Sequence, residues 1–467
     1  MTSPPGTEPL PGSNILRQML PSRRELREVV GLALPVVAVQ VGMMAMGVVD
    51  TIMVGHFSAR DLAAVALGNL YFFTATVFPM GILLSLDPVI SQAVGAVDRV
   101  GVTRGLQRGG VLAMALAVPA ILVLLPGHLV LTLLNQPREV VPVAAGYALA
   151  AVPGVVPFLG FMVLRQTLQA MGRLAPIVVT ILAANVANLF FNWVLIYGRL
   201  GVPPLGAVGS GWASSLSRWL MLLALLALAW PVLAPHLRSL RADALQLKPL
   251  VRMLRLGVPI GIQLSLEFGA FGAIGVLMGW LGTLAMAGHQ VALNLASLTF
   301  MVPLGISQAT AVLVGRGVGR GDPPGARRSA GTGLLLGASF MLLAALVFLA
   351  IPEPLARLYS SEAPVVTLAA VLIPLAGIFQ VFDGLQVVAS GVLRGVGDTR
   401  SPMIINLLGF WCIGMPVSVW LGFRTAAGPV GLWWGLVAGL AGVAVFLLLR
   451  VGNRMGRDLR RILIDES

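Results

Sequence analysis

The sequence has few charged side chains for its length. Of its 467 residues only 10% are charged, and 57% are hydrophobic. Soluble domains carry about 25% charged and about 45–50% apolar residues. So few charges cannot cover the water-exposed surface of a chain this long. The composition therefore excludes a soluble globular protein and indicates a polytopic membrane protein.

Cysteine and lysine are nearly absent too. The single cysteine, Cys412, excludes an intrachain disulfide and a cysteine-based metal cluster. The single lysine, Lys248, is followed by Pro249, which excludes the GK[ST] segment of a phosphate-binding loop. We therefore expect no ATP site of that kind and no bound cofactor. A transporter with this sequence would draw its energy from an ion gradient or a partner protein.

The apolar residues form runs long enough to cross about 30 Å of hydrocarbon. The net charge of +13 does not indicate nucleic-acid binding, because the arginines are spread between these runs rather than gathered on one segment. Twelve runs stand between polar breaks, at 29–55, 62–95, 109–134, 140–163, 175–198, 206–233, 254–282, 286–315, 330–351, 364–393, 401–423 and 428–450.

Basic residues favour one side of these runs. The tails and alternate loops on the side of both termini hold 25 Lys and Arg, the other side holds 5, and Arg218 lies inside a run. Cytoplasmic loops carry the excess of Lys and Arg. We therefore expect a multi-pass protein of the bacterial inner membrane with both termini in the cytoplasm. The first 28 residues are polar and proline-rich, and we expect no cleaved signal peptide there.

The second half of the sequence repeats the first at an offset near 224. Pro35 in LALPVVAVQ corresponds to Pro259 in LGVPIGIQL. Each half holds six runs, an even number, so the halves share one direction across the membrane. We therefore expect an all-α membrane protein of two six-helix lobes related by a parallel repeat, with a cleft between them. The predicted divisions are a cytoplasmic tail at 1–28, an N-terminal lobe at 29–234, a cytoplasmic linker at 235–250, a C-terminal lobe at 251–450 and a cytoplasmic tail at 451–467.

Carboxylates inside membrane spans are costly and therefore point to function. Glu267 and Asp383 fall near the middle of the C-terminal lobe, on spans that run in opposite directions, so they are placed to face each other. Two carboxylates in a low dielectric disfavour double ionisation, and together they can hold a proton or a monovalent cation. The repeat has Met43 and Leu159 at the corresponding positions, which favours a functional role over a packing role.

The N-terminal lobe has a different polar set in the outer half of its spans. Asp50 lies in the first span, and Asn188 and Asn192 lie one turn apart on one face of the fifth. Ser214 lies early in the sixth span. These four residues are expected to form one polar cluster, although the asparagines alone are equally explained by hydrogen bonds between helices.

Three segments carry a resemblance to a known family. VVDTIMVGHFSARDLAAVALG, GHQVALNLASLTFMVPLGISQA and FQVFDGLQVVASGVLRGVGDTRSPM resemble the multidrug and toxic compound extrusion (MATE) family in its NorM-like branch. The resemblance runs from about residue 27 to 450. It implies two V-shaped lobes that alternate access and export organic cations against Na⁺ or H⁺ entry. It assigns the coupling cation, Na⁺ if a metal, to Glu267 and Asp383, and a second proton or cation site to Asp50, Asn188, Asn192 and Ser214.

One position departs from that pattern. Some relatives carry a tyrosine one turn before the second carboxylate, where this chain has Phe379, so one oxygen ligand is missing and the choice between Na⁺ and H⁺ stays open. An apolar cleft suits small-molecule organic cations, and methionine adapts to ligands of varied shape. The candidate cleft residues are Met43, Met46, Phe271, His289, Gln290, Phe300 and Phe379.

The leading functional prediction is a secondary antiporter that exports lipophilic organic cations. The alternative is a flippase of lipid-linked precursors from the same superfamily, which would favour a cleft lined with arginines for pyrophosphate. Only Arg218 lies clearly within a span. The segment GAVDRVGVTR at 95–104 is one residue short of the facilitator-superfamily loop, and the four histidines lack metal-ligand spacing, so we expect neither that fold nor an enzyme. A monomer is expected.

Overall fold

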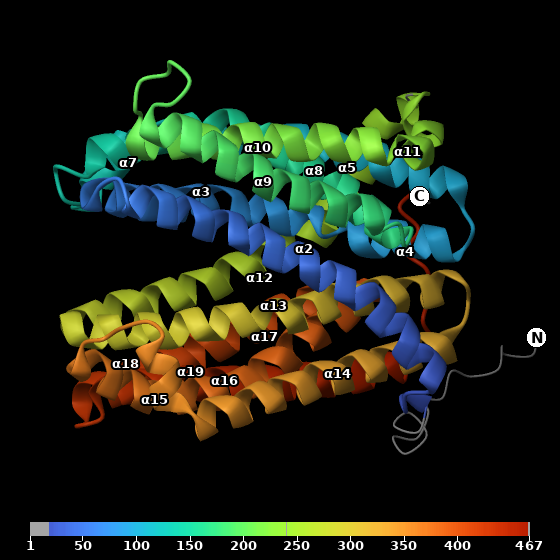
Figure 1. The fold of residues 1–467 in the computed structure, drawn as a ribbon. Helices are drawn as coiled ribbons and strands as arrows, with labels where there is room; N and C mark the ends of the chain where they lie inside the picture. The colour runs from blue at the N-terminus through green and yellow to red at the C-terminus, as the bar shows by residue number, and fades with distance from the viewer. Residues whose placement is uncertain (1–17, 240, 466–467) are drawn as a thin grey trace, which may run out of the picture. The chain divides into compact units, whose positions relative to one another are not determined.

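The computed structural model describes residues 18–239 and 241–465, and within these ranges every regular element is a helix (Figure 1). Twelve helical stretches in them are long and apolar enough to cross a membrane. Both findings confirm the predicted all-α class and the predicted number of spans. Predicted and observed spans differ most at their ends, where charged residues extend several helices past the apolar run.

Six spans precede the middle of the chain, and several consist of more than one helix. A break at Leu84 and Ser85 separates two helices of the second span, and a short 3₁₀ turn divides the fourth. The elements of this half are α2 (Arg23–Gly55), α3 (Ala59–Leu83) with α4 (Leu86–Gly95), α5 (Arg99–Leu124), α6 (Gly127–Leu133), α7 (Val141–Ala151) with η1 (Val152–Gly154) and α8 (Val155–Ala170), α9 (Ala175–Tyr197), α10 (Gly206–Leu228), α11 (Trp230–Leu237) and η2 (Ala242–Leu245).

The other six spans follow in the same order. The eleventh is interrupted by a π-helical segment, η3. The elements are α12 (Leu247–Trp280), α13 (Thr283–Gly319), α14 (Pro323–Ala350), α15 (Pro352–Arg357), α16 (Ala363–Gly395), α17 (Arg400–Asn406) with η3 (Leu407–Gly414) and α18 (Met415–Arg424), and α19 (Gly428–Met455).

The third span begins and ends about ten residues earlier than its hydropathy predicts. Helix α5 begins at Arg99 and ends at Leu124, whereas the apolar run suggested 109–134. The side chain of Asp98 accepts a hydrogen bond of 2.8 Å from the amide of Gly101, which caps the helix at this point. The basic residues that were assigned to a loop are therefore helical, and the apolar residues after Leu124 belong to α6.

The chain packs into two compact units. The N-terminal unit holds residues 38–94, 98–261 and 464–465 of the described chain, and the C-terminal unit holds 18–37, 95–97 and 262–463. The two long helices α2 and α12 are thus each shared between the units, with divisions after Val37 and Gly261. The lobe bounds expected from the sequence, 29–234 and 251–450, stay a prediction.

Both divisions fall two residues after a proline inside a helix, Pro35 in α2 and Pro259 in α12. Proline removes a backbone hydrogen bond and kinks a helix, which lets the two halves of one helix pack on different neighbours. The two prolines correspond in the sequence repeat, so each half of the chain has one proline just before a division between the units.

Glycines allow the first half of each shared helix to approach its neighbour closely. In the N-terminal unit, a Cβ atom on Gly81 of α3 would lie 2.5 Å from Cα of Gly261, and one on Gly257 would lie 2.5 Å from the carbonyl oxygen of Ile82. In the C-terminal unit, a Cβ atom on Gly305 of α13 would lie 2.9 Å from the amide nitrogen of Val37. Small residues at such crossings let membrane helices pack backbone to backbone.

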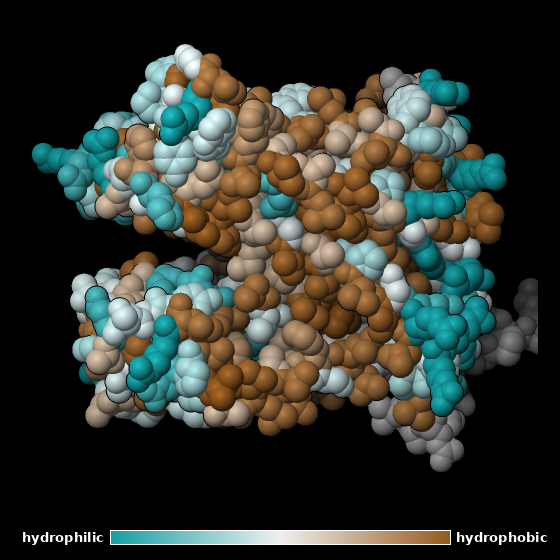
Figure 2. Space-filling model, in the orientation of Figure 1, coloured by the Kyte–Doolittle hydropathy of each residue, from teal (hydrophilic) through white to brown (hydrophobic). Residues whose placement is uncertain are grey.

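Hydrophobic side chains cover the middle of the helices in each unit, and hydrophilic ones gather at the helix ends (Figure 2). Large apolar side chains such as Leu182, Val186 and Leu343 are more than half exposed. A lipid bilayer accepts such a surface, whereas water does not.

Candidate functional site

The N-terminal unit encloses a carboxylate among neutral polar groups. Asp50 of α2 is 2% exposed. Its Oδ1 accepts a hydrogen bond of 2.5 Å from Nδ2 of Asn192, and its Oδ2 accepts one of 2.7 Å from the hydroxyl of Ser214. Nδ2 of Asn192 also donates to Oδ1 of Asn188 at 3.1 Å. The structure therefore brings together all four residues that the sequence placed in the N-terminal cluster, while their role as an ion site stays a prediction.

Two further side chains border this cluster. The hydroxyl of Tyr147 on α7 donates to Oδ1 of Asn69 on α3 at 3.1 Å. Arg218 of α10 lies one turn after Ser214, and its charge acts on both Asp50 and Tyr147. From the sequence, Arg218 stands out only as a basic residue inside a span, and its position one turn from Ser214 is the signal that links it to this cluster.

The C-terminal unit holds a second polar site, which α12, α16 and α17 build. Nε2 of Gln386 lies 3.4 Å from Oε2 of Glu267 and 3.2 Å from Oδ1 of Asn406, and donates to both. Nδ2 of Asn406 donates in turn to the carbonyl oxygen of Pro402 at 2.9 Å. Gln386 and Asn406 are both buried, 1% and 0% exposed. One amide group thus orients the carboxylate of Glu267 from the neighbouring helix.

Asp383 lies on α16 three residues before Gln386 and is 5% exposed. It interacts electrostatically with Glu267. Oδ1 of Asp383 and Oε1 of Gln386 are buried oxygen atoms without a hydrogen-bond donor among the described residues. Buried polar atoms normally have a partner, so a cation or a proton would satisfy these two oxygens.

The polar site of the C-terminal unit differs from a metal centre that is built only from His, Cys, Asp and Glu side chains. No group of three or more His, Cys, Asp and Glu side chains in the described ranges is placed to hold a metal ion. A coupling ion at this site would therefore be held by two carboxylates and by neutral amide oxygen, which are ligands that hard cations accept.

The π-helical segment η3 adjoins this site. Asn406 directly precedes it, and the indole nitrogen of Trp411 within it donates to the carbonyl oxygen of Leu266 at 3.1 Å, next to Glu267. π-Helical turns inside α-helices occur frequently at functional sites. Gln386, Asn406 and Trp411 were not predicted from the sequence, because a neutral amide or an indole inside a span gives no charge signal.

Aromatic rings enclose the same region of the C-terminal unit. The ring of Phe379, one turn before Asp383, lies 5.8 Å from that of Phe271 and 5.9 Å from that of Trp433. His289 lies 5.7 Å from Trp433 and is 1% exposed. Phe271, His289 and Phe379, which the sequence predicted to line a substrate cleft, thus belong to one aromatic cluster, in which Phe271 is half-buried and the other two are buried.

The other four candidate cleft residues are described within the unit to which each belongs. In the N-terminal unit, Met46 is 9% exposed and Sδ of half-buried Met43 lies 3.7 Å from Nη1 of Arg165. In the C-terminal unit, Gln290 is exposed and Phe300 is half-buried. The assignment of these seven residues to a substrate cleft stays a prediction.

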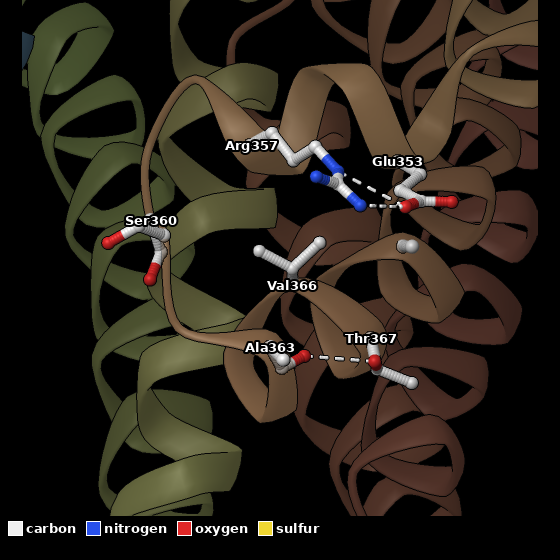
Figure 3. A pocket seen from close by; sticks show the side chains of 8 residues that line it. Glu353, Arg357, Ser360, Ala363, Val366 and Thr367 are labelled. Carbon is white, nitrogen blue, oxygen red and sulfur yellow. Dashed lines mark hydrogen bonds and ion pairs between the residues drawn. The ribbon is translucent and has the colours of Figure 1, made fainter.

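A pocket of about 480 Å³ lies at the turn between α15 and α16 (Figure 3). Arg357 forms an ion pair of 2.7 Å with Glu353 on its wall, and the hydroxyl of Thr367 donates to the carbonyl oxygen of Ala363. Its lining contains none of the residues singled out above.

Both halves of the chain match one family model, and curated proteins resemble the chain over nearly its whole length. The model, described as MatE, matches residues 35–194 and 259–420. The multidrug resistance protein MdtK of Edwardsiella ictaluri is 36% identical over 437 residues, which cover 92% of this chain and 95% of that protein. MdtK of Pectobacterium atrosepticum is 35% identical over 448 residues, which cover 94% and 98%.

Solved structures share the fold at lower sequence identity. The crystal structure of the eukaryotic MATE transporter AtDTX14 has a TM-score of 0.85 at 23% identity, and the match covers 93% of this chain and 97% of that chain. An outward-facing multidrug resistance transporter of the MATE family has a TM-score of 0.83 at 19% identity, with 96% and 98% covered. The arrangement of helices is therefore common to all three chains along most of their length.

Proposed function

The chain belongs to the multidrug and toxic compound extrusion family and is a multidrug efflux transporter of the bacterial inner membrane, and we propose that it works as a secondary antiporter. In this proposal it exports lipophilic organic cations in exchange for Na⁺. The observation that carries the proposal is the pair of buried oxygen atoms, Oδ1 of Asp383 and Oε1 of Gln386, that have no donor in the described structure, together with the half-buried carboxylate of Glu267 that Gln386 contacts.

The chemistry of that set favours Na⁺ over H⁺. A proton needs one acceptor, and either carboxylate would supply it. The donor-free amide oxygen of Gln386 adds a neutral ligand beside Glu267 and Asp383, which a metal cation uses and a proton does not. The ring of Phe379 supplies no oxygen one turn before Asp383, so Gln386 would take the place of the tyrosine ligand of some relatives.

Exchange requires that ion and drug favour opposite arrangements of the two lobes. A ligand with equal affinity for both arrangements would drive nothing. One Na⁺ entering for each monovalent drug cation leaving moves no net charge, so such an exchange would draw only on the Na⁺ concentration gradient.

The first test measures efflux of ethidium from proteoliposomes under an imposed Na⁺ gradient and, separately, under an imposed H⁺ gradient. We expect Na⁺-driven efflux in the wild type and its loss in Glu267→Gln, because the neutral amide weakens the cation site. Glu362→Gln is the matched control, since Glu362 is exposed at the start of α16 in the same unit. The control should retain wild-type efflux.

Two other results would redirect the proposal. Proton-driven efflux that survives Glu267→Gln would assign coupling to Asp50 in the N-terminal unit. Absence of ethidium movement under either gradient would favour the flippase alternative, which moves lipid-linked precursors.

The excess of basic residues supports a further proposal about topology. With 25 Lys and Arg on one side and 5 on the other, both termini would lie in the cytoplasm. We also propose a monomer that works without ATP. Labelling of single cysteines at the exposed positions 238 and 424 in intact cells, in a Cys412→Ser background, should reach position 424 from outside and not position 238.

A further inference from the structure

The last described residues occupy a basic site of the N-terminal unit. Oδ1 of Asp465 accepts a hydrogen bond of 2.6 Å from Nη2 of Arg108, and Oδ2 accepts one of 3.0 Å from Nη1 of Arg104. The two arginines lie one turn apart on α5, so their guanidinium groups share one face of the helix. Arginine offers this arrangement of donors to carboxylates and to phosphates alike.

The segment before α12 holds these arginines in place. The side chain of Asp243 in η2 accepts a hydrogen bond of 2.8 Å from Nε of Arg104, and its carbonyl oxygen accepts one of 3.2 Å from Nη2 of Arg108. Nε2 of Gln107 donates to two carbonyl oxygens of residues 236–239, at 2.8 and 2.9 Å. The segment is therefore fixed against α5, and the guanidinium groups have set positions.

The site keeps a positive charge with its carboxylates in place. Arg241 forms an ion pair of 3.1 Å with Asp243, and Nη1 of Arg252 donates to the carbonyl oxygen of Ile464 at 2.8 Å. The arginines of the site thus outnumber its aspartates. The side chain of Arg108 is 2% exposed, and its Nε is buried without an acceptor among the described residues. A further anionic oxygen would satisfy this donor.

Asp465 is the more exposed member of its contact with α5. Its side chain is 39% exposed, against 2% for Arg108. Departure of Asp465 would return its carboxylate to water, whereas the buried guanidinium of Arg108 would lose an anionic partner at a high cost in free energy. Another anion would therefore replace this carboxylate more readily than water would.

The site lies at one end of a membrane span, because α5 begins at Arg99. Lipid phosphates lie at the ends of spans, and basic pockets there bind phosphate headgroups. We propose that Arg104 and Arg108 form a binding site for a phosphate group, in which the carboxylate of Asp465 is a competing internal anion. The phosphate belongs to the headgroup of an anionic phospholipid or to a soluble phosphate compound, and both present the same oxygens to the arginines.

The test titrates detergent-purified protein with dioleoyl phosphatidylglycerol, and separately with dioleoyl phosphatidylcholine, and counts bound lipid by native mass spectrometry. Asp465→Asn removes the competing charge at nearly constant size, so the dissociation constant of the first phosphatidylglycerol should fall roughly fivefold. Asp458→Asn is the matched control, because it removes a carboxylate that pairs with Arg460 at the exposed surface. The control should bind as the wild type does, and binding of the zwitterionic lipid should not respond to Asp465→Asn.

Two further variants in the Asp465→Asn background locate the site. Arg104→Gln and Arg108→Gln should each weaken phosphatidylglycerol binding about tenfold, since each removes a charged donor to the phosphate. The side chain of Arg104 is 28% exposed, so Arg104→Gln tests the site even where loss of the buried Arg108 impairs folding.

Titration with inorganic phosphate, read as a rise in the thermal unfolding midpoint of Asp465→Asn, distinguishes the two sources. A response to phosphatidylglycerol alone assigns the site to a lipid headgroup, and a response to inorganic phosphate assigns it to a soluble compound. Asp465→Asn that binds neither probe more tightly than the wild type would overturn the proposal, and so would tight binding that survives both arginine variants. Asp465 would then only anchor the chain segment. These outcomes leave the proposed function intact, because ion and drug exchange involve none of these residues.

Discussion

The most informative single residue of the C-terminal site is Gln386. Its amide nitrogen orients Glu267, and its oxygen remains without a donor in the described structure. Gln386→Leu keeps the approximate size of the side chain and removes both functions. Groups that orient ion ligands are typically worth 10–100-fold in affinity, so the Na⁺ concentration for half-maximal ethidium efflux should rise about tenfold or more.

Gln246→Leu is the matched control for that change, since Gln246 is exposed and lies just before α12. Titration of efflux rate against Na⁺ concentration compares the two variants. An unchanged half-maximal concentration in Gln386→Leu would show that the amide does not take part in the ion site.

Among the single residues of the two polar sites, the sequence predicts the charged ones better than the neutral ones. Asp50, Glu267 and Asp383 stand out because a carboxylate in an apolar span is conspicuous. Gln386 and Asn406 do not stand out, since amides in spans usually serve helix packing. Their contact depends on how α16 and α17 face each other, which hydropathy does not encode.

The packing of individual helices depends on glycine at the points where two helices cross. Gly81→Ala would place a methyl group against the backbone of Gly261, so α3 and α12 would have to separate. Overpacking of this kind costs about 1–3 kcal/mol, and we expect a lower thermal unfolding midpoint in detergent. Gly110→Ala on α5 is the matched control, because nothing lies within 4 Å of its Cβ position. If Gly81→Ala melted no lower than Gly110→Ala, close approach of α3 and α12 would be wrong.

Hydropathy does not predict where a helix ends or where it is interrupted. Apolar runs locate the twelve spans, because a bilayer requires about 20 apolar residues in a row. They do not locate the start of α5 at Arg99, which depends on the cap at Asp98. The π-helical segment η3 was not predicted either, since its apolar residues suit an ordinary helix equally well.

In the molecule as a whole, the last described residues return to the N-terminal unit. Asp465 accepts hydrogen bonds from Nη2 of Arg108 at 2.6 Å and from Nη1 of Arg104 at 3.0 Å. Arg108 is only 2% exposed, whereas the side chain of Asp465 is 39% exposed. Asp465→Ala should therefore lower the free energy of unfolding by roughly 1 kcal/mol after discount for solvent screening.

The control for that variant is Asp458→Ala, which removes an ion pair with Arg460 at the exposed surface. Such pairs contribute close to nothing. Thermal unfolding of both variants in the same detergent provides the comparison. Equal midpoints would show that the contact of the chain end with α5 does not stabilise the protein.

The sequence repeat predicts part of the division of the chain into two compact units. It pairs Pro35 with Pro259, and both prolines lie beside a division between the compact units. It does not predict that α2 and α12 are each shared between units, because the exchange of helix halves depends on close contacts such as that of Gly305 with Val37.

In the proposed cycle, Na⁺ and an organic cation move in opposite directions and their movements are coupled. The most direct measurement loads proteoliposomes with ethidium, omits any ion gradient and follows uptake of ²²Na⁺. Because coupling between two ligands is reciprocal, outward movement of ethidium should drive ²²Na⁺ inward in the wild type and not in Glu267→Gln. Ethidium efflux without ²²Na⁺ uptake in the wild type would show that the protein is not a Na⁺ antiporter.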